Sequence, residues 1–314
     1  MVDKISIVVP CYNEEEVVDS FYKEINRVFS DEMKGTHYEI IFVDDGSSDN
    51  TFQKIKRIRE LDEKVHYVSL SRNFGKESAM YAGLQYADGD YTVIMDADLQ
   101  HPPKYIPIMY ATIKRTNVDM IATRRKQRSN EPRLASFFAN TFYRVMNTIS
   151  GINMGNNAMD YRMLNKRSKD AIVGLREYNR FSKGIFEWIG FKTIWLEIDV
   201  NMRVGGVSKW SFTKLLKYAI EGCVAYSTLP LSIASVVGLL FCIIAFGMIV
   251  VMVFQSMIWG IKGTGYATII CLMLIIGGIQ LFCLGILGQY LAKDYLENKK
   301  RPIYLVQESS KEIN

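Results

Sequence analysis

The 314-residue sequence lacks the features of a secreted, disulfide-rich or repetitive protein. Of its five cysteines, Cys11 ends an apolar run typical of a buried strand, and we interpret it as a small hydrophobic residue. The same interpretation applies to the cysteines inside long apolar runs, which are Cys242, Cys271 and Cys283. The chain starts directly with a strand-like run, and no internal repeat or low-complexity segment follows. We therefore expect no signal peptide, no disulfide framework and no structural zinc site.

A large excess of charge of either sign is also absent. The formal net charge is +5 at pH 7, with 23% charged residues. Such a modest positive charge suits a surface that faces anionic lipid. It is no argument for nucleic acid, so we expect no nucleic-acid partner.

Charge is missing altogether from two long stretches near the C-terminus. No charged residue occurs between Glu221 and Lys262, and none between Lys262 and Lys293. A transmembrane helix needs about 20 mostly apolar residues, so each stretch is long enough to cross a bilayer once. The alternative is a buried core hairpin, but runs such as 236–254 are too long and too uniformly apolar for one. We predict two transmembrane helices within residues 229–292.

The charges that flank these stretches predict the orientation of the chain. Only Lys262 lies in the loop between them. The basic residues outside the loop are Lys209, Lys214, Lys217, Lys293, Lys299, Lys300 and Arg301. By the positive-inside rule, both ends then lie in the cytosol. We expect a multi-pass protein of the cell (inner) membrane with its soluble domain on the cytosolic side.

The segment 211–222 has the pattern of a short amphipathic helix. Phe212, Leu215, Leu216 and Ala219 share one face. Such a helix can lie at the membrane interface before the first span. The alternative interpretation is an ordinary helix of the soluble domain.

Apolar runs alternate with helical patterns over the first 125 residues or so, which is typical of a mainly parallel sheet with crossover helices. The expected strands are 5–10, 38–43, 65–70, 91–95 and 118–122, with a later one at 192–200, and the expected helices are 14–31, 49–61 and 76–87. The sequence thus predicts an α/β fold. Polar residues follow several strands: Asn13, Glu14, Asp44, Asp45, Arg72, Asn73, Asp96 and Asp98. Ligands of open α/β sheets bind at the carboxyl ends of the strands, so these residues indicate one site.

The triplet Asp96-Ala97-Asp98 follows the apolar run 91–95. Two carboxylates at a strand end can face a hard cation together with a diphosphate, and Gln100 offers another oxygen. Aspartates are common in loops, so the triplet alone is a weak signal. Its position after a buried strand favours a divalent metal site, for Mg²⁺ or Mn²⁺.

Two further loops allow both a structural and a functional interpretation. Residues 44–49 and 72–76 each precede a predicted helix, and their polar side chains can act as helix caps. The functional interpretation is that Asp44 accepts hydrogen bonds from a base or a ribose. Lys76 can reach a phosphate, but the sequence does not decide between these roles.

Five stretches carry a resemblance: SIVVPCYNEE at 6–15, VDDGSSD at 43–49, RNFGK at 72–76, DADLQHPP at 96–103 and RVGGVSKW at 203–210. Together they resemble the family 2 glycosyltransferases, whose nucleotide-diphospho-sugar transferase fold is of the GT-A type. The last two stretches are similar to the polyprenyl-phosphate branch, which includes the dolichyl-phosphate mannose synthases and the bactoprenol-phosphate glucosyltransferases. The resemblance covers the whole chain, because the bactoprenol enzymes also end in two spans.

The resemblance implies a role for individual residues. The nucleotide-sugar would be held by Pro10, Tyr12, Glu14, Asp44, Asp96 and Ala97, and the metal by Asp96, Asp98 and Gln100. The acceptor phosphate would meet Arg124, Arg203 and Lys209, and the catalytic set would be Asp98, Asp160 and Arg203. Relatives often have glycine before the aspartate at 160, whereas this chain has Met159, which weakens the assignment of Asp160.

The chemistry of the acceptor agrees with the resemblance. A phosphomonoester has its second pKa near about 6, so it is already largely anionic at neutral pH and needs no strong general base. Cations that place it matter more. Arg203 and Lys209 flank a Gly-Gly turn shortly before the first span, and glycines suggest close backbone approach to a ligand. The alternative is that these charges only flank the membrane.

We therefore expect a cytosolic GT-A domain at 1–210, an interfacial helix at 211–228, two transmembrane helices at 229–292 and a cytosolic tail at 293–314. The expected reaction is inverting transfer of a sugar, with UDP-glucose as the favoured donor, to undecaprenyl phosphate. UDP-N-acetylhexosamines, UDP-aminoarabinose derivatives and GDP-mannose remain open as donors, and homo-oligomerisation is also open.

Three rival interpretations are less favoured. A processive polysaccharide synthase would carry a Q-x-x-R-W motif and more spans, and the sequence has neither. A non-catalytic membrane scaffold would not need the intact Asp96 and Asp98. A channel would need ionisable residues inside the spans, where there are none.

Overall fold

The computed structural model describes residues 2–126, 158–199, 229–259 and 265–313. The chain divides into two compact units, one formed by Met1–Ser211 with Arg301–Asn314 and the other by Phe212–Lys300. The expected interfacial helix at 211–228 lies outside the described residues.

The first unit is built on one eight-stranded sheet in the order β7-β5-β6-β4-β1-β2-β3-β8. Its strands are β1 (Lys4–Cys11), β2 (His37–Asp44), β3 (Val65–Leu70), β4 (Tyr91–Ile94), β5 (Met120–Arg125), β6 (Ala158–Asn165), β7 (Thr193–Ile198) and β8 (Val306–Ser309). Strands β3, β2, β1 and β4 are parallel neighbours, and β5 pairs in parallel with β7. Strand β6 runs antiparallel between β4 and β5, and β8 runs antiparallel to β3. The expected α/β class and mainly parallel sheet are therefore confirmed.

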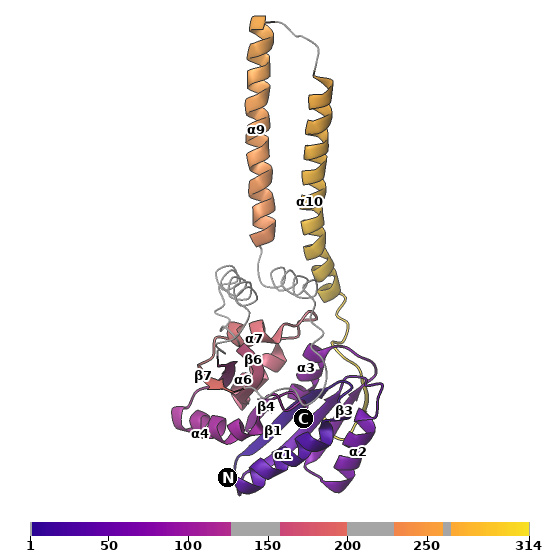
Figure 1. Ribbon diagram of the computed structural model, residues 1–314, viewed down its shortest axis with the longest axis vertical. Helices are drawn as coiled ribbons and strands as arrows, with labels where there is room; N and C mark the ends of the chain where they lie inside the picture. The colour runs from indigo at the N-terminus through magenta and orange to yellow at the C-terminus, as the bar shows by residue number, and fades with distance from the viewer. Residues whose placement is uncertain (1, 127–157, 200–228, 260–264, 314) are drawn as a thin grey trace. The chain divides into compact units, whose positions relative to one another are not determined.

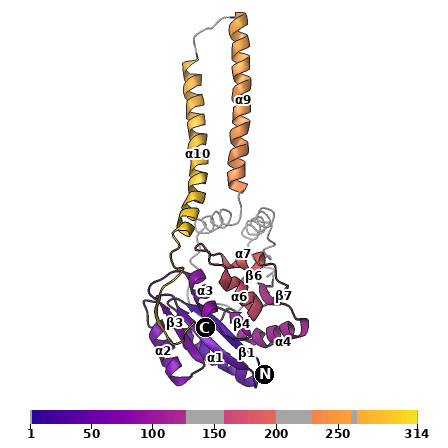
Figure 2. The ribbon, with the colours of Figure 1, turned by 180° about the vertical axis from the view of Figure 1, so that it is seen from behind.

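Helices cover both faces of this sheet, as Figures 1 and 2 show from opposite sides. One face packs against α1 (Val18–Asp31), α2 (Thr51–Leu61) and α4 (Ile106–Thr116), and a short 3₁₀ turn at Pro103–Tyr105 precedes α4. The other face packs against α3 (Lys76–Tyr86), α6 (Lys166–Gly174) and α7 (Ser182–Trp188).

The alternation of side chains along β1 explains why helices cover both faces of the sheet. Ile5, Ile7 and Val9 belong to the core on the α1 side, whereas Val8 packs with α3. Because successive strand residues point to opposite faces, a continuous apolar run can fill two cores. Crossover helices then keep both faces out of water, and the loops at the carboxyl ends of the strands stay free for a site.

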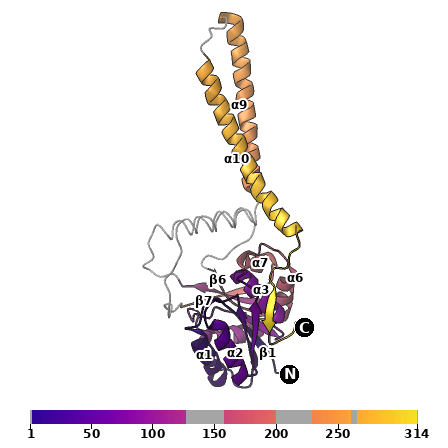
Figure 3. The same cartoon turned by 90° about the vertical axis from the view of Figure 1, so that its right-hand side faces the viewer.

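Two strands were not expected from the sequence. Strand β6 contains Asp160 and Arg162 among its eight residues, and these charges interrupt the apolar pattern from which a buried strand is predicted. Arg162 is nevertheless fully buried. Strand β8 lies in the expected C-terminal tail and pairs with β3 at the edge of the sheet. It is the yellow strand near the C-terminus in Figure 3.

The segment that follows α10 (Tyr266–Asn298), residues 301–313, makes further contacts with the rest of the first unit. The Tyr304 hydroxyl donates a hydrogen bond to Gln85 at 2.6 Å, and its ring packs edge-on against Tyr81 at 6.2 Å between centroids. Both partners belong to α3. The residues after the second long helix are thus an integral part of the α/β unit.

The second unit contains two long apolar helices, α9 (Leu229–Trp259) and α10 (Tyr266–Asn298). Each includes a window long and apolar enough to cross a membrane, Leu231–Met248 with mean hydropathy 2.5 and Ile275–Asn298 with 1.7. Almost none of either window is buried inside the protein. By length, composition and exposure each helix is a candidate for one of the two expected spans, although α10 continues to Asn298, past the expected limit at 292.

Candidate active site

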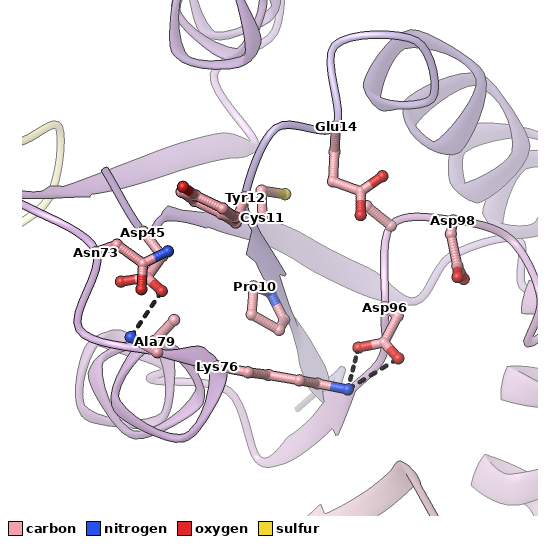
Figure 4. Close-up of a pocket in the computed structure, with 12 residues that line it drawn as sticks. Pro10, Cys11, Tyr12, Glu14, Asp45, Asn73, Lys76, Ala79, Asp96 and Asp98 are labelled. Carbon is pink, nitrogen blue, oxygen red and sulfur yellow. Dashed lines mark hydrogen bonds and ion pairs between the residues drawn. The ribbon is translucent and has the colours of Figure 1, made fainter. Parts of the chain in front are cut away.

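A pocket opens at the carboxyl ends of β1, β2 and β4 and at the start of α3 (Figure 4). It is lined by Pro10, Cys11, Tyr12, Glu14, Asp45, Asn73, Gly75, Lys76, Ala79, Asp96, Ala97 and Asp98. The polar loops expected at this edge of the sheet therefore converge on one cavity. The site lies where open α/β sheets bind ligands.

The loop after β2 closely contacts the loop after β3. Gly46 has φ +67°, and a Cβ there would lie 2.5 Å from the backbone carbon of Arg72. The Asp45 carboxylate accepts hydrogen bonds from the backbone N–H groups of Phe74 at 2.7 Å and Gly75 at 2.8 Å. Burial raises the pKa of Asp45, and these two N–H donors offset part of that rise. Asp45 thereby holds the loop from which α3 starts.

The loop after β1 is braced against the start of α2. Asn13, in the left-handed region at φ 55°, accepts a hydrogen bond on Oδ1 from the Ser48 N–H at 2.9 Å. The Glu14 N–H donates to Thr51 Oγ1 at 2.8 Å. These contacts hold Tyr12, whose side chain is 47% exposed, beside the pocket. An exposed aromatic ring in this place can stack on a nucleobase.

Lys76 joins two carboxylates that are distant in the sequence. Its Nζ lies 2.7 Å from Asp96 Oδ1 and 2.9 Å from Asp96 Oδ2, and it also donates to Asp160 Oδ2 at 2.8 Å. Figure 4 shows the Lys76 side chain extending across the pocket to Asp96. Asp160 enters from β6, which pairs with β4. The start of α3 and two neighbouring strands thus meet at one ammonium group.

The ionisation of Asp160 follows from this contact. Burial alone would raise the pKa of its carboxyl group, but the charges of Lys76 and Lys183, together with the hydrogen bond from Lys76, lower that pKa to about 2. Arg162, two residues along β6, is fully buried and stacks over the Phe186 ring at 3.8 Å. Its positive charge also favours the ionised form of Asp160.

The loop that carries Asp98 is ordered by its own carboxylate. Asp98 Oδ1 accepts a hydrogen bond from the Gln100 N–H at 3.1 Å, and Leu99 between them adopts φ 55°. His101 stacks on Tyr161 at 5.7 Å, and burial lowers the pKa of its imidazole. This loop presents Asp98 to the pocket, whereas Gln100 is not among the lining residues.

The structure brings together most, but not all, of the residues expected in the site. Pro10, Tyr12, Glu14, Asp96, Ala97 and Asp98 line the pocket, and Asp160 contacts it through Lys76. Arg203 and Lys209 lie outside the described residues.

Two expected residues point elsewhere. The Asp44 side chain is buried and accepts hydrogen bonds from the Ser47 N–H and the Ser69 hydroxyl, both at 3.2 Å. Arg124 pairs with Glu197 at 2.7 Å on the surface beside β7. In this structure Asp44 therefore shapes the loop, and neither residue lines the pocket.

Some lining residues were missed or left undecided from the sequence. Asp45 and Asn73 were expected at this edge of the sheet but were given no individual role, and Gly75 belongs to the loop interpreted as a helix cap. Lys76 was considered for a phosphate without a decision. The signal that distinguishes Asp45 is the tight turn at Gly46, which directs one carboxylate into the protein and the next toward the loop at 72–75.

The donor set fits a hard divalent cation. Asp96 and Asp98 offer carboxylate oxygens on the same pocket wall, and both oxygens of Asp96 already contact a positive charge, the Lys76 ammonium. Among residues 2–126, 158–199, 229–259 and 265–313, no group of three or more His, Cys, Asp or Glu side chains forms a ready metal cage. A metal held by two carboxylates would therefore complete its shell with water and with phosphate oxygens of a substrate.

A mainly parallel sheet with an acidic pocket at the carboxyl ends of its strands fits a nucleotide-diphospho-sugar transferase fold of the GT-A type. The family model described as "Glycosyl transferase family 2" matches residues 6–181, and the chain belongs to this family.

Relatives match over nearly the whole chain. A bactoprenol glucosyl transferase of Shigella phage SfX is 37% identical over 304 residues, which cover 97% of this chain and 99% of that protein. The putative glycosyltransferase CsbB of Bacillus subtilis (strain 168) is 36% identical, with 98% and 92% covered. A crystal structure of glucosyl-3-phosphoglycerate synthase from Mycobacterium tuberculosis in complex with Mn²⁺, UDP and phosphoglyceric acid is similar at a TM-score of 0.49 and 15% identity, with 71% and 76% covered.

Proposed function

We propose that this glycosyltransferase moves a sugar from a nucleotide-sugar to a polyprenyl phosphate, with UDP-glucose and undecaprenyl phosphate as the favoured substrates. The products would be a polyprenyl-monophosphate sugar, with inverted configuration at the anomeric carbon, and a nucleoside diphosphate. The observation that carries the proposal is the single pocket at the carboxyl ends of the strands that Asp96, Asp98 and the exposed ring of Tyr12 line together. The bactoprenol glucosyl transferase that matches nearly end to end supports the acceptor.

The pocket residues would divide the donor between them. Tyr12, Pro10 and Asn73 lie on the β1 and β3 side, where the nucleoside would bind, and Asp96 and Asp98 lie at the end of β4. Asp96 and Asp98 would hold Mg²⁺ or Mn²⁺. The metal would neutralise charge on the leaving diphosphate.

Asp160 supports an acceptor that needs no deprotonation. With a pKa of about 2, its carboxylate is a weak base, so it is poorly suited to remove a proton from a hydroxyl. A phosphate acceptor is already anionic at neutral pH. Asp160 would instead hold a cation close to the reacting groups. Arg203 and Lys209 stay proposed contacts of the acceptor phosphate, and Arg124 would have to exchange its pairing with Glu197 for the phosphate to act as a third.

The lipid acceptor is held in a membrane, and the apolar helices α9 and α10 would anchor the enzyme there. Each contains a window with mean hydropathy of 1.7 or more and almost no burial inside the protein. We propose that both cross the membrane and that the α/β unit lies on the cytosolic side, as the flanking lysines indicate.

The test is transfer from radiolabelled UDP-glucose to undecaprenyl phosphate by the detergent-purified full-length protein, with and without EDTA. A labelled, organic-extractable lipid that disappears with EDTA is the expected result. No transfer would send the assay to UDP-N-acetylhexosamines, UDP-aminoarabinose derivatives and GDP-mannose. Failure with all of these donors, together with no metal-dependent nucleotide binding, would overturn the proposal in favour of a non-catalytic scaffold.

A further inference from the structure

The pocket has an unusual balance of charge for a site that receives phosphates. Its described lining contains the carboxylates Glu14, Asp45, Asp96 and Asp98 but a single cationic side chain, Lys76. A nucleoside diphosphate brings further negative charge into this surface. Positive charge therefore has to be supplied where the phosphates arrive, and Lys76 is positioned to supply part of it.

Lys76 occupies the place on Asp96 that a metal would need. Both carboxylate oxygens of Asp96 lie within 2.9 Å of the ammonium, so a divalent cation that binds Asp96 meets another positive charge at contact distance. Two cations at such a separation repel strongly, and one of them has to move. Lysine is the one able to move, because its four-carbon stem is flexible.

Asp160 keeps the ammonium in the site when that happens. It accepts from the same Nζ at 2.8 Å and is placed by β6, whereas Asp96 follows β4. The Lys76 backbone is fixed independently, since Asp45 holds the two residues that precede it. Lys76 thus has a fixed base and two anchors for its charged end.

Building on the proposed function, we propose that Lys76 and the divalent metal compete for Asp96, and that the displaced ammonium, retained by Asp160, binds phosphate oxygens of a substrate. Lys76 is then a positioning residue for the metal site and a binding residue for phosphate. The phosphate can belong to the nucleotide donor or to the lipid acceptor, and the experiment separates these two sources.

The test uses Lys76→Met in the full-length protein in detergent. Its first measurement is the affinity for Mn²⁺ without nucleotide, for which the electron paramagnetic resonance signal reports the concentration of free Mn²⁺. Removal of the competing ammonium is expected to tighten Mn²⁺ binding by on the order of tenfold. Unchanged or weaker Mn²⁺ binding would overturn the competition. Lys76→Arg, which keeps the charge, is expected to stay close to wild type.

The second measurement concerns phosphate. At saturating Mn²⁺, two ligands are compared: UDP, and farnesyl phosphate as a soluble analogue of the acceptor. Lys76→Met is expected to weaken the binding of one of them by on the order of tenfold. Loss with UDP assigns Lys76 to the donor, and loss with farnesyl phosphate assigns it to the acceptor. If neither ligand is affected, the phosphate role is wrong.

Lys114→Met is the matched control. Lys114 forms a similar lysine–aspartate pair with Asp3 at 2.6 Å, on the far end of α4 and away from the pocket. It should change neither measurement. If the wild-type protein itself binds neither Mn²⁺ nor UDP, the proposed function fails. If the wild type binds both and Lys76→Met behaves identically, only the present inference fails.

Discussion

The ammonium of Lys311 lies 2.7 Å from Oε2 of Glu39, a buried carboxylate 272 positions earlier in the chain. Glu39 also accepts a hydrogen bond from the Ser6 hydroxyl at 2.6 Å and pairs with Lys4 at 2.9 Å. Lys311 further pairs with Asp88 at 3.2 Å. The last residues of the chain therefore complete a charge cluster at the amino-terminal end of the central strands.

We expect Lys311→Met to destabilise the α/β unit. Glu39 is 2% exposed, so loss of one partner leaves part of a buried charge unbalanced, at a cost of about 1 to 3 kcal/mol. The loss is checked by thermal unfolding of the full-length protein in detergent. Arg27→Met removes only exposed pairs on α1 and should leave Tm nearly unchanged. Equal Tm values for wild type and Lys311→Met would show that the C-terminal segment is not anchored in this way.

Asp98→Asn tests the metal assignment. The substitution keeps the shape of the side chain but removes a proposed metal ligand, so we expect turnover to fall by about two or more orders of magnitude. Expression and membrane insertion should be intact, as judged by yield and detergent extraction. Full activity of this variant would remove Asp98 from the metal site.

His66 predicts a component of stability that depends on pH. Burial lowers the pKa of its imidazole below the ordinary 6.5, although the nearby Glu39 acts in the opposite direction. The unfolded chain therefore binds a proton at His66 more readily than the folded protein does, and stability falls as the pH drops through 6.5 toward the lowered pKa.

The comparison that isolates this component is His66→Gln. Its stability should depend less steeply on pH between about 5 and 7 than that of the wild type, as measured by urea unfolding at several pH values. Parallel pH profiles for the two proteins would contradict the prediction.

Gly46→Ala tests the contact that shapes the pocket. The residue has φ +67°, and a methyl group would lie 2.5 Å from the Arg72 carbonyl carbon and 2.7 Å from the Asn73 nitrogen. The left-handed conformation alone costs about 1 to 3 kcal/mol for a non-glycine residue, and the clash adds to it. We expect lower Tm and weaker UDP binding. Gly35→Ala is the control, because Gly35 has φ +85° but open space around it, so it should lower Tm without affecting UDP.

The parallel part of the fold could be predicted because its strands are apolar runs with sharp boundaries. Val65–Leu70 was predicted with its exact bounds. Strands β1 and β2 extend the predicted ranges by one residue at each end, and β4 ends one residue earlier than predicted. Strand β6 could not be found in this way, because burial of the Arg162 side chain depends on partners from other elements, among them the Phe186 ring. Strand β8 is short and polar, and only its pairing with β3 makes it a strand.

Some residues of the site could likewise be predicted from the sequence, and others depend on the tertiary structure. Asp96 and Asp98 could be chosen because their position after a buried strand predicts that they reach the ligand edge of the sheet. The sequence could not show which partners Asp44 and Asp45 have, since both are buried and a single tight turn directs Asp44 toward Ser69 and Asp45 toward the loop at 72–75.

The amino-acid sequence by itself determined the α/β class, the two apolar C-terminal helices and the edge of the sheet that carries the site. These follow from periodicity, composition and strand direction, which are local properties of the chain. Only the tertiary structure decided that Lys76 joins Asp96 to Asp160 and that Lys311 reaches Glu39. Such contacts form only when packing of the sheet and its helices brings distant segments of the chain together. No local sequence pattern specifies which distant side chains then meet.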